Sequence, residues 1–364
     1  MRLQTAAEAA PADLWEPIAK RELHWLHAGW HAWLSCASCS LWTGWSAATA
    51  APMEPSDEWC PWHACVDASD APFVRWFAGA STNAAFNEVD RHVLATTGAS
   101  MAFIDSGDGS CTSVRELLVE AALVAYVMAR EYGLTPGQRL AFYLPNDVQA
   151  IIWISAAKRL GMPYAAVASG TGSRSLASRI DDTAAAVLVT SEALVVKAER
   201  AVDESHAPPI GVLVPPATRS FDGWRMAATA VGSAREHVRT NGSDLQLLAH
   251  ASAAELVSAL WRVARPEPVD ACFPLFMLYT SGSTGVPKGI VHTHGGYEVG
   301  LCLTSKVVFN LQPTDDVFLV LATPGWITGQ SYMLAAALLC RVPSVRGARP
   351  HWQNPWGPSL AGPP

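Results

Sequence analysis

Short apolar runs alternate with segments of helical periodicity between residues 101 and 190. Four runs have the length and residue content of buried strands, at residues 101–104, 139–144, 164–167 and 185–190. Three segments between them have the pattern of helices, at residues 113–132, 148–160 and, beginning a helix, 176–181. Strands that alternate with helices form a mostly parallel sheet with helices on both of its faces. The sequence therefore predicts the α/β fold class.

The rest of the chain shows these patterns less regularly. We expect further strands at residues 210–214 and 270–278 and further helices at residues 245–263 and 295–309. Residues 220–241 show neither pattern, and we expect them to be irregular. Residues 317–322 are apolar throughout, which is typical of a strand at the centre of a parallel sheet.

The stretch from Tyr279 to Gly289 has the composition of a phosphate-binding loop. Its glycines permit backbone angles closed to other residues, so that backbone N–H groups can converge on an anion. Hydroxyl donors and one positive charge complete such a cradle. The residues that we expect to bind phosphate are Thr280, Ser281, Gly282, Ser283, Thr284, Gly285 and Lys288. The alternative, a Ser/Gly-rich surface turn, does not explain the closing Pro-Lys-Gly sequence after a strand.

This loop is not the P-loop of the common nucleotide triphosphatases. That motif requires Gly-Lys-Ser/Thr four residues after its first glycine. Counted from Gly282, the second glycine position holds Pro287, and Gly289 stands where a Ser or Thr would bind magnesium. Two of the four fixed positions therefore fail.

The loop resembles the phosphate-binding signature of the acyl-adenylate-forming (AMP-dependent synthetase/ligase) superfamily. Its flanks, residues 289–297 and 323–332, resemble acetyl-CoA synthetase and its short-chain relatives, and more narrowly the synthetase portion of propionyl-CoA synthase. The resemblance implies a ligase that activates a small carboxylic acid with ATP to an acyl-adenylate and pyrophosphate. Coenzyme A then displaces AMP to give the acyl-CoA. The implied cofactors are ATP, CoA and Mg²⁺, and the implied partner is the small carboxylic acid.

The same resemblance suggests further site residues. Trp326, Ile327 and Thr328 match residues that line the acyl pocket, although a buried tryptophan can also be plain core. Nearby, Thr323 and Gln330 stand where the family has Asp and His. A second candidate group, for the CoA phosphate, consists of Lys197 and Arg200, which a solvated helix face explains equally well.

Residues 76–92 resemble a further block of these enzymes, with Trp76-Phe77, Asn83 and Asp90-Arg91-His92 in matching places. We expect its polar side chains to hold a loop against the domain. Asp90 and His92 are accordingly not expected to act as a catalytic pair.

The resemblance covers residues 12–26 and 71–345 and only the N-terminal half of a family member. We expect a helical segment at 1–26, an irregular insertion at 27–70, a partial AMP-binding domain at 71–345 and an irregular Pro-rich tail at 346–364. The chain is thus expected to be a truncated large N-terminal domain. It lacks the family's C-terminal catalytic lysine, so no catalytic residue is assigned and the chain alone is expected to be inactive. The alternative is a non-catalytic fragment or a nucleotide-binding pseudoenzyme.

Composition excludes several other classes of protein. The net charge is −7, from 25 basic and 32 acidic residues, and no Lys/Arg run appears, which argues against binding to nucleic acid. No apolar stretch is long enough to span a membrane, and the N-terminus does not resemble a secretory signal, so we expect a cytoplasmic protein. Two cysteine pairs, Cys36/Cys39 and Cys60/Cys65, could suggest zinc, but we predict no metal site in the protein itself. The sequence makes no prediction of the oligomeric state.

Overall fold

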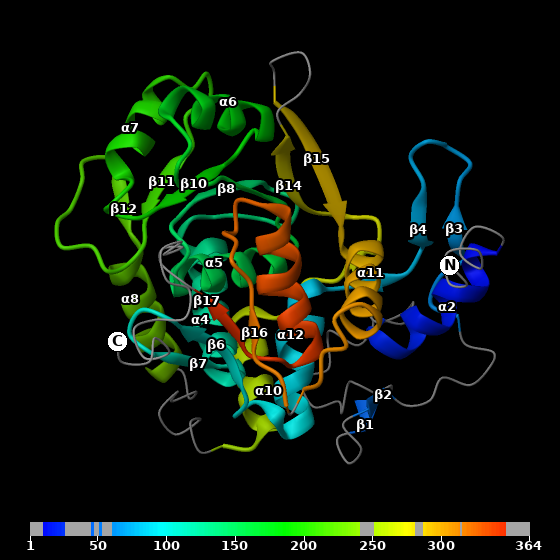
Figure 1. Cartoon of the computed structure of the whole chain (residues 1–364). Coiled ribbons are helices and arrows are strands. Elements are labelled where there is room, and N and C mark those ends of the chain that lie inside the picture. The colour runs from blue at the N-terminus through cyan, green and yellow to red at the C-terminus, as the bar shows by residue number, and fades with distance from the viewer. Residues whose placement is uncertain are drawn as a thin grey trace, which may run out of the picture.

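The computed structural model describes residues 10–25, 45–46, 51–52, 60–240, 251–280, 287–313 and 315–346. Its largest feature is a seven-stranded sheet in the order β12-β11-β10-β8-β9-β14-β15 (Figure 1). Neighbouring strands are parallel throughout, except that β14 and β15 are antiparallel. The strands are β8 (Leu140–Tyr143), β9 (Tyr164–Ala166), β10 (Val187–Thr190), β11 (Ile210–Leu213), β12 (Trp224–Met226), β14 (Pro274–Thr280) and β15 (Lys288–Thr293). The predicted α/β class is confirmed.

Helices cover both faces of this sheet (Figure 1). Strand β8 shows why, because alternate side chains of a strand point to opposite faces. Leu140 and Phe142 belong to the large core that also contains side chains of α4 (Val114–Tyr126), α5 (Val148–Arg159), α8 (Ala227–Thr240) and α10 (Ala253–Ala264). Ala141 and Tyr143 pack instead with side chains of α6 (Ser173–Thr183) and α7 (Val195–Asp203).

Local side chains set where three of these helices begin. Ser113 and Glu116 form a reciprocal capping box at the start of α4, and Ser252 and Glu255 do the same for α10. Asp147 caps α5 by accepting a hydrogen bond from the backbone of Ala150 at 3.0 Å. These starts therefore follow from residues three positions apart.

The structure corrects the expectation that residues 220–241 are irregular. They form β12, which lies at the edge of the large sheet, and α8. The buried face of α8 consists of Ala227, Ala230, Ala234 and Val238, which recur at helical spacing. Because three of these four side chains are alanine, the helix has little of the large apolar periodicity that reveals a helix in sequence. The expected helix at 245–263 begins only at Ala253, and residues 241–250 lie outside the described part.

A second, four-stranded sheet has the order β16-β17-β6-β7. Its strands are β6 (Met101–Asp105), β7 (Cys111–Ser113), β16 (Phe318–Leu319) and β17 (Ser344–Arg346). The expectation of a central strand at 317–322 is wrong for this structure. Within the described residues β16 pairs only with β17, and Val317, Leu319 and Leu321 are all exposed. A uniformly apolar run shows that side chains favour burial, but it does not show which strands lie beside it.

The N-terminal residues pack into a smaller aromatic core. Helix α2 (Pro11–Glu22) leads into Trp25, whose ring lies 5.3 Å from that of Trp62 and 5.2 Å from that of Phe77. Trp62 precedes β3 (Ala64–Asp67), which pairs antiparallel with β4 (Arg75–Ala78). Regular structure therefore occurs at the end of the range 27–70, which we expected to be irregular. Most of residues 27–59 lies outside the described part, apart from the paired β1 (Trp45–Ser46) and β2 (Ala51–Pro52).

The remaining elements complete the described structure. They are β5 (Ser81–Thr82), β13 (Val269–Asp270), α11 (His294–Val307), α12 (Ala337–Cys340) and the π-helical segments η1 (Phe86–Asp90), η2 (Val93–Thr97), η3 (Val127–Glu131) and η4 (Gly329–Ala336). Arg346, where the irregular tail was expected to start, is still in β17 and pairs with Asp105 at 3.0 Å. Residues 347–364 lie outside the described part. None of the helices described is long and apolar enough to cross a membrane.

Candidate active site at the sheet edge

Parallel strands bring several candidate residues to one edge of the large sheet. Strands β8, β9 and β14 run in the same direction and end at Tyr143, Ala166 and Thr280. The loops that follow these strands therefore emerge at a common edge. Ligands bind at this carboxyl edge in open α/β sheets. The candidate phosphate loop follows β14 and is thus placed where the fold class most often binds a ligand.

The structure describes the two ends of the candidate phosphate loop. Thr280 ends β14 and Lys288 begins β15, and the two residues are direct partners in the antiparallel pair. Both are exposed. The residues between them, Ser281, Gly282, Ser283, Thr284 and Gly285, lie outside the described part, so their role in a cradle stays a prediction. The loop is accordingly the tip of a hairpin, with its hydroxyl and its ammonium group on facing strands.

The N-terminus of α11, the helix expected at residues 295–309, lies away from the candidate phosphate loop. The helix begins at His294, after β15. Thr293, at the end of β15, pairs with Pro274 at the start of β14, whereas Lys288 pairs with Thr280 at the loop. Six strand residues at roughly 3.3 Å each place the helix start roughly 17–20 Å from the loop. The partial charge of a helix falls off within its first turn, so α11 adds little at that distance.

The hairpin is anchored to α6 just before the loop. The Tyr279 hydroxyl donates to Asp182 Oδ2 at 2.8 Å and lies 3.0 Å from the Thr183 hydroxyl. The guanidinium of Arg179 lies 5.2 Å from the centre of the Tyr279 ring. Burial, together with the neighbouring Asp182, raises the pKa of Tyr279 to about 12. The tyrosine therefore stays neutral and keeps its proton for the bond to Asp182.

The candidate acyl-pocket residues lie on a turn that contacts the same edge. Trp326 is 66% exposed, and Ile327 and Thr328 are exposed as well, so the plain-core alternative for the tryptophan does not hold. Gly325 lies directly against the backbone of Ala168, which follows β9, and a methyl group on this glycine would overlap it. Strand β9 also pairs with β14, which leads to the phosphate loop. The turn thus contacts the segment that follows β9, and β14 pairs with β9 itself.

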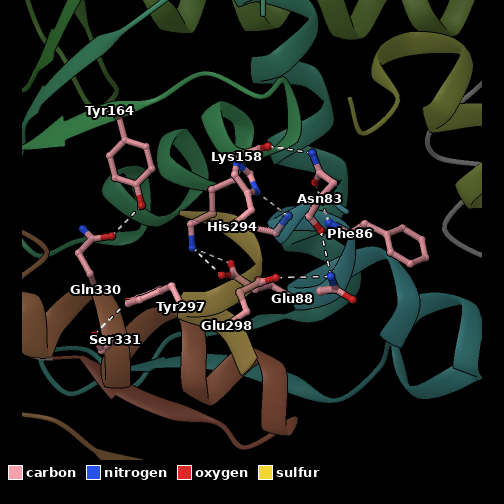
Figure 2. Close-up of polar contacts among 12 residues, drawn as sticks. Asn83, Phe86, Glu88, Lys158, Tyr164, His294, Tyr297, Glu298, Gln330 and Ser331 are labelled. Atoms are coloured by element: carbon pink, nitrogen blue, oxygen red, sulfur yellow. Dashed lines mark hydrogen bonds and ion pairs between the residues drawn. The ribbon is translucent and has the colours of Figure 1, made fainter. Parts of the chain in front are cut away.

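Buried hydrogen bonds hold this turn in place (Figure 2). The Gln330 side chain, on η4, donates to the carbonyl oxygen of Pro324 at 2.6 Å and accepts from the Tyr164 hydroxyl at 2.7 Å. Tyr164 is on β9 and is fully buried. Tyr297 and Ser331 form a second bond between α11 and η4, at 3.0 Å. Gln330 therefore ties the exposed Trp326 turn to the core of the sheet.

Behind η4 lies a cluster of buried charges that the sequence did not reveal (Figure 2). Lys158 Nζ, on α5, lies 2.6 and 2.8 Å from the two carboxylate oxygens of Glu88 on η1. Glu298, on α11, is also fully buried; its Oε2 accepts from Asn87 at 3.4 Å, and its Oε1 has no partner in the described part of the chain. Lys158 thus bonds Glu88 and not Glu298, although its charge acts on both carboxyl groups.

The charges of this cluster follow from its geometry. Burial raises the pKa of Glu298 to about 8, and the negative charge of Glu88 adds to the rise. Burial also lowers the pKa of His294 to about 3, with the Lys158 charge acting in the same direction. Neutral His294 accepts a hydrogen bond from the backbone of Ala84 through Nδ1, at 3.2 Å. Burial thus favours the neutral forms of Glu298 and His294 at neutral pH, beside the Lys158–Glu88 contact.

The block at residues 76–92 holds chain segments together, as expected. Asn83 donates to the carbonyl oxygens of Lys158 at 3.0 Å and Glu267 at 2.7 Å. Asp90 is fully buried, pairs with Arg159 at 2.7 Å and accepts from the indole of Trp261 at 2.8 Å. These partners leave Asp90 committed to structural contacts.

The candidate CoA residues lie on a different part of the same edge. Lys197 and Arg200 are exposed on α7, which begins at Val195, shortly after β10 ends. Strand β10 is three positions from β14 in the sheet, or roughly 14 Å at the usual strand spacing. The structure does not bring them to the phosphate loop, and their role stays a prediction. No cluster of three or more metal-binding side chains occurs in the described ranges, and Cys36 and Cys39 lie outside them.

Comparisons with known proteins cover most of this chain. Residues 90–350 match the family described as AMP-binding enzyme. Acetyl-coenzyme A synthetase from Mycobacterium bovis is 34% identical over 279 residues, which are 75% of this chain and 41% of that protein. The enzymes of the same name from Mycolicibacterium smegmatis and Paraburkholderia phymatum are 34% and 35% identical, over 76% and 75% of this chain and 28% and 40% of theirs. The chain spans about two fifths or less of the length of these relatives. The narrower likeness to propionyl-CoA synthase stays a prediction.

Proposed function

The chain belongs to the AMP-binding enzyme family, and from that premise we propose that it is the adenylate-forming part of a short-chain acyl-CoA synthetase. In the proposed reaction a small carboxylate attacks the α-phosphate of ATP, which releases pyrophosphate and leaves an acyl-adenylate. The thiol of CoA then attacks the acyl carbon and releases AMP.

One observation supports the proposal: β14, which leads to the candidate loop, pairs with β9, and the turn at Gly325 lies against Ala168, two residues after β9. Thr280 and Lys288 face each other at the base of the tip, with an exposed hydroxyl and an exposed ammonium group. Gly325, the residue before the exposed Trp326, lies against the backbone of Ala168. In this proposal the phosphates of ATP bind at the hairpin and the apolar tail of the carboxylate contacts the Trp326 turn. The carboxylate group must reach the phosphates while its tail stays on apolar side chains, so the reaction needs both sites close together.

The residues present fit the phosphate part of ATP. Lys288 supplies a positive charge and Thr280 a donor, and both are exposed to a ligand. In this proposal Lys288 neutralises charge on the phosphates. The hydrogen bond from Gln330 to Pro324 holds the Trp326 turn in place. For Mg²⁺ the described residues offer no cluster of acidic or histidine side chains, so we assign it no protein ligand. CoA would meet Lys197 and Arg200 along the same sheet edge.

Binding of ATP to the Lys288→Ala variant tests the phosphate site. A charge-assisted hydrogen bond to phosphate is worth about 1.5–3 kcal/mol, so removing it should weaken ATP binding about tenfold or more. Lys20→Ala, which removes a lysine paired with Glu16 on α2, is the matched control and should leave the affinity unchanged. Equal ATP affinities for the Lys288→Ala variant and the unmodified chain would contradict the phosphate site.

Carboxylate-dependent exchange between ATP and pyrophosphate tests the activity itself. Exchange that requires a short carboxylate, such as acetate or propionate, would support adenylate formation by this chain. If the chain binds nucleotide but no carboxylate supports exchange, the alternative is favoured, a nucleotide-binding protein without catalytic activity.

A further inference from the structure

The β14–β15 hairpin projects from one edge of the large sheet (Figure 1). Strand β9 pairs with β14 only at residues 276–277, and β15 is the edge strand. Among the described strands, the last two residues of β14, Tyr279 and Thr280, therefore pair with β15 alone. Lys288, the partner of Thr280, takes part in none of the ion pairs of the described residues. The position of its ammonium group thus depends on what holds the end of the hairpin.

Two side-chain hydrogen bonds from α6 hold this end of the hairpin, and both go to Tyr279. The tyrosine hydroxyl donates to Asp182 Oδ2 at 2.8 Å. It has a single proton, so it accepts from the Thr183 hydroxyl, 3.0 Å away. The bond to the carboxylate is the stronger of the two, because charge-assisted hydrogen bonds are about twice as strong as neutral ones. Within the described part of the chain, no other side-chain hydrogen bond joins residues 279–280 or 288–289 to the rest of the fold.

A glycine on β15 brings Asp182 next to Lys288. Gly289 is the cross-strand partner of Tyr279 and directly follows Lys288 in the chain. A methyl group on Gly289 would lie 3.3 Å from the Tyr279 ring and 3.5 Å from Asp182 Oδ2. The carboxylate, the ring and the strand therefore lie together one residue from the lysine that is proposed to bind phosphate.

The charge of Asp182 would by itself oppose phosphate binding. The proposed function places the phosphates of ATP at Lys288, and a negative charge beside an anion site repels the anion. Any favourable effect of Asp182 on ATP must therefore come from its bond to Tyr279. Helix α6 gives this bond a firm base, because Leu176 and Ile180 are fully buried against the sheet.

We propose that Asp182 is a positioning residue for ATP, which acts through Tyr279 to hold Lys288 where the phosphates bind. The inference rests on the proposed function of the hairpin. In this role Asp182 has no contact with ATP and takes no part in the chemistry. When its bond to Tyr279 is lost, the hairpin populates other positions, and the apparent affinity for ATP falls with the fraction of chains that keep the binding position.

Isothermal titration calorimetry of ATP binding to three variants of the full chain tests this role. Asp182→Ala and Tyr279→Phe should each weaken ATP binding about three- to tenfold, which is the range expected for one hydrogen bond. Asp182→Asn keeps an acceptor oxygen without the charge, so it should bind ATP within about twofold of the unmodified chain. Tighter ATP binding in both Asp182 variants would overturn the proposal, because Asp182 would then act through its charge alone.

Asp181→Ala is the matched control, because it removes the same charge one residue away on α6. Asp181 accepts hydrogen bonds from Ser205 and His206 and not from the hairpin, so the affinity for ATP should stay unchanged. A double variant separates positioning from a general loss of structure. If Asp182 acts through Lys288, adding Asp182→Ala to Lys288→Ala should weaken binding little further. A full further loss in the double variant, or an equal loss in Asp181→Ala, would overturn the proposal.

The Lys288→Ala variant also separates this inference from the proposed function. Weaker ATP binding in Lys288→Ala, together with unchanged binding in Asp182→Ala, would overturn the positioning role and leave the phosphate site intact. Unchanged ATP binding in both variants would overturn the phosphate site and the positioning role together.

Discussion

Replacing Glu298 by glutamine should remove a pH dependence of stability that the buried charge cluster creates. Glu298 is fully buried, and two cations act on it through their charges, Lys158 and Arg91. Lys158 bonds Glu88, and Arg91 donates to the carbonyl oxygens of Glu22 and Leu339. Glutamine has nearly the shape of a protonated glutamic acid and does not ionise. The variant therefore keeps the neutral form that the folded chain prefers and loses only the ability to become charged.

The direction of this pH dependence follows from the number of protons bound by the folded and unfolded chain. The pKa of Glu298 is about 8 in the folded chain, against 4.5 for an ordinary glutamate. Between these values the folded chain holds a proton that the unfolded chain has released, so the contribution of Glu298 to stability falls as pH rises. It is fully present below pH 4.5 and lost as pH rises to about 8. The difference corresponds to at most about 5 kcal/mol.

The measurement is the free energy of unfolding in urea at several pH values from 5 to 8.5, for the unmodified chain and the Glu298→Gln variant. Buried His24 and His294, whose pKa values are lowered by burial, add an opposite trend, because they must gain protons when the chain unfolds in acid. That trend is common to both proteins and cancels in their difference. The difference, variant minus unmodified, should rise by several kcal/mol between pH 5 and 8.

Glu204→Gln is the matched control, because Glu204 is exposed at the end of α7. Its difference from the unmodified chain should stay flat over the same pH range. A difference for Glu298→Gln that is constant to within about 1 kcal/mol would refute the reasoning. It would mean that Glu298 is already ionised in the folded chain at neutral pH.

Three further predictions concern substitutions at specific contacts in the structure. Glu88→Gln should lower the free energy of unfolding by about 3–5 kcal/mol, because it leaves Lys158 buried without its anion. In the same urea titration, the double variant with Lys158→Met should recover most of this loss. Gly325→Ala should destabilise the fold by about 1–3 kcal/mol, because the added methyl group overlaps the backbone of Ala168 after β9. Gly300→Ala should not, because its methyl group meets open space. Equal melting temperatures for the two variants would contradict this prediction. Ser113→Ala should cost about 1 kcal/mol in urea unfolding, because it removes the cap of α4, and an unchanged midpoint would count against the capping box.

The site and the buried cluster are connected through the structure. Gln330 bonds both Pro324, in the exposed turn, and Tyr164, in the sheet. The next residue, Ser331, bonds Tyr297, one residue before Glu298 on α11. The turn proposed to face the acyl group thus rests on η4, and η4 rests on the helix that holds the buried carboxyl group.

The candidate phosphate loop could be proposed from sequence because its residues are local. The hydroxyls, glycines and lysine all lie within residues 280–288, and their composition indicates a phosphate loop, which stays a prediction. The placement of that loop after a strand also held, as β14 ends at Thr280. Sequence could not show that the strand after the loop returns antiparallel and carries the helix start away from the loop. That depends on the hydrogen bonds between β14 and β15.

The sequence by itself determined the α/β class, the position of the candidate loop after a strand and the starts of several helices, because periodicity, capping and turn formation act between residues a few positions apart. Only the tertiary structure decided that β16 is an edge strand, that the alanine face of α8 is buried and that Lys158 bonds Glu88 rather than Glu298. Lys158 and Glu88 are 70 residues apart in sequence, and Asn87 and Glu298 are 211 residues apart. Burial and charge depend on which distant segments meet, and no local pattern records that choice.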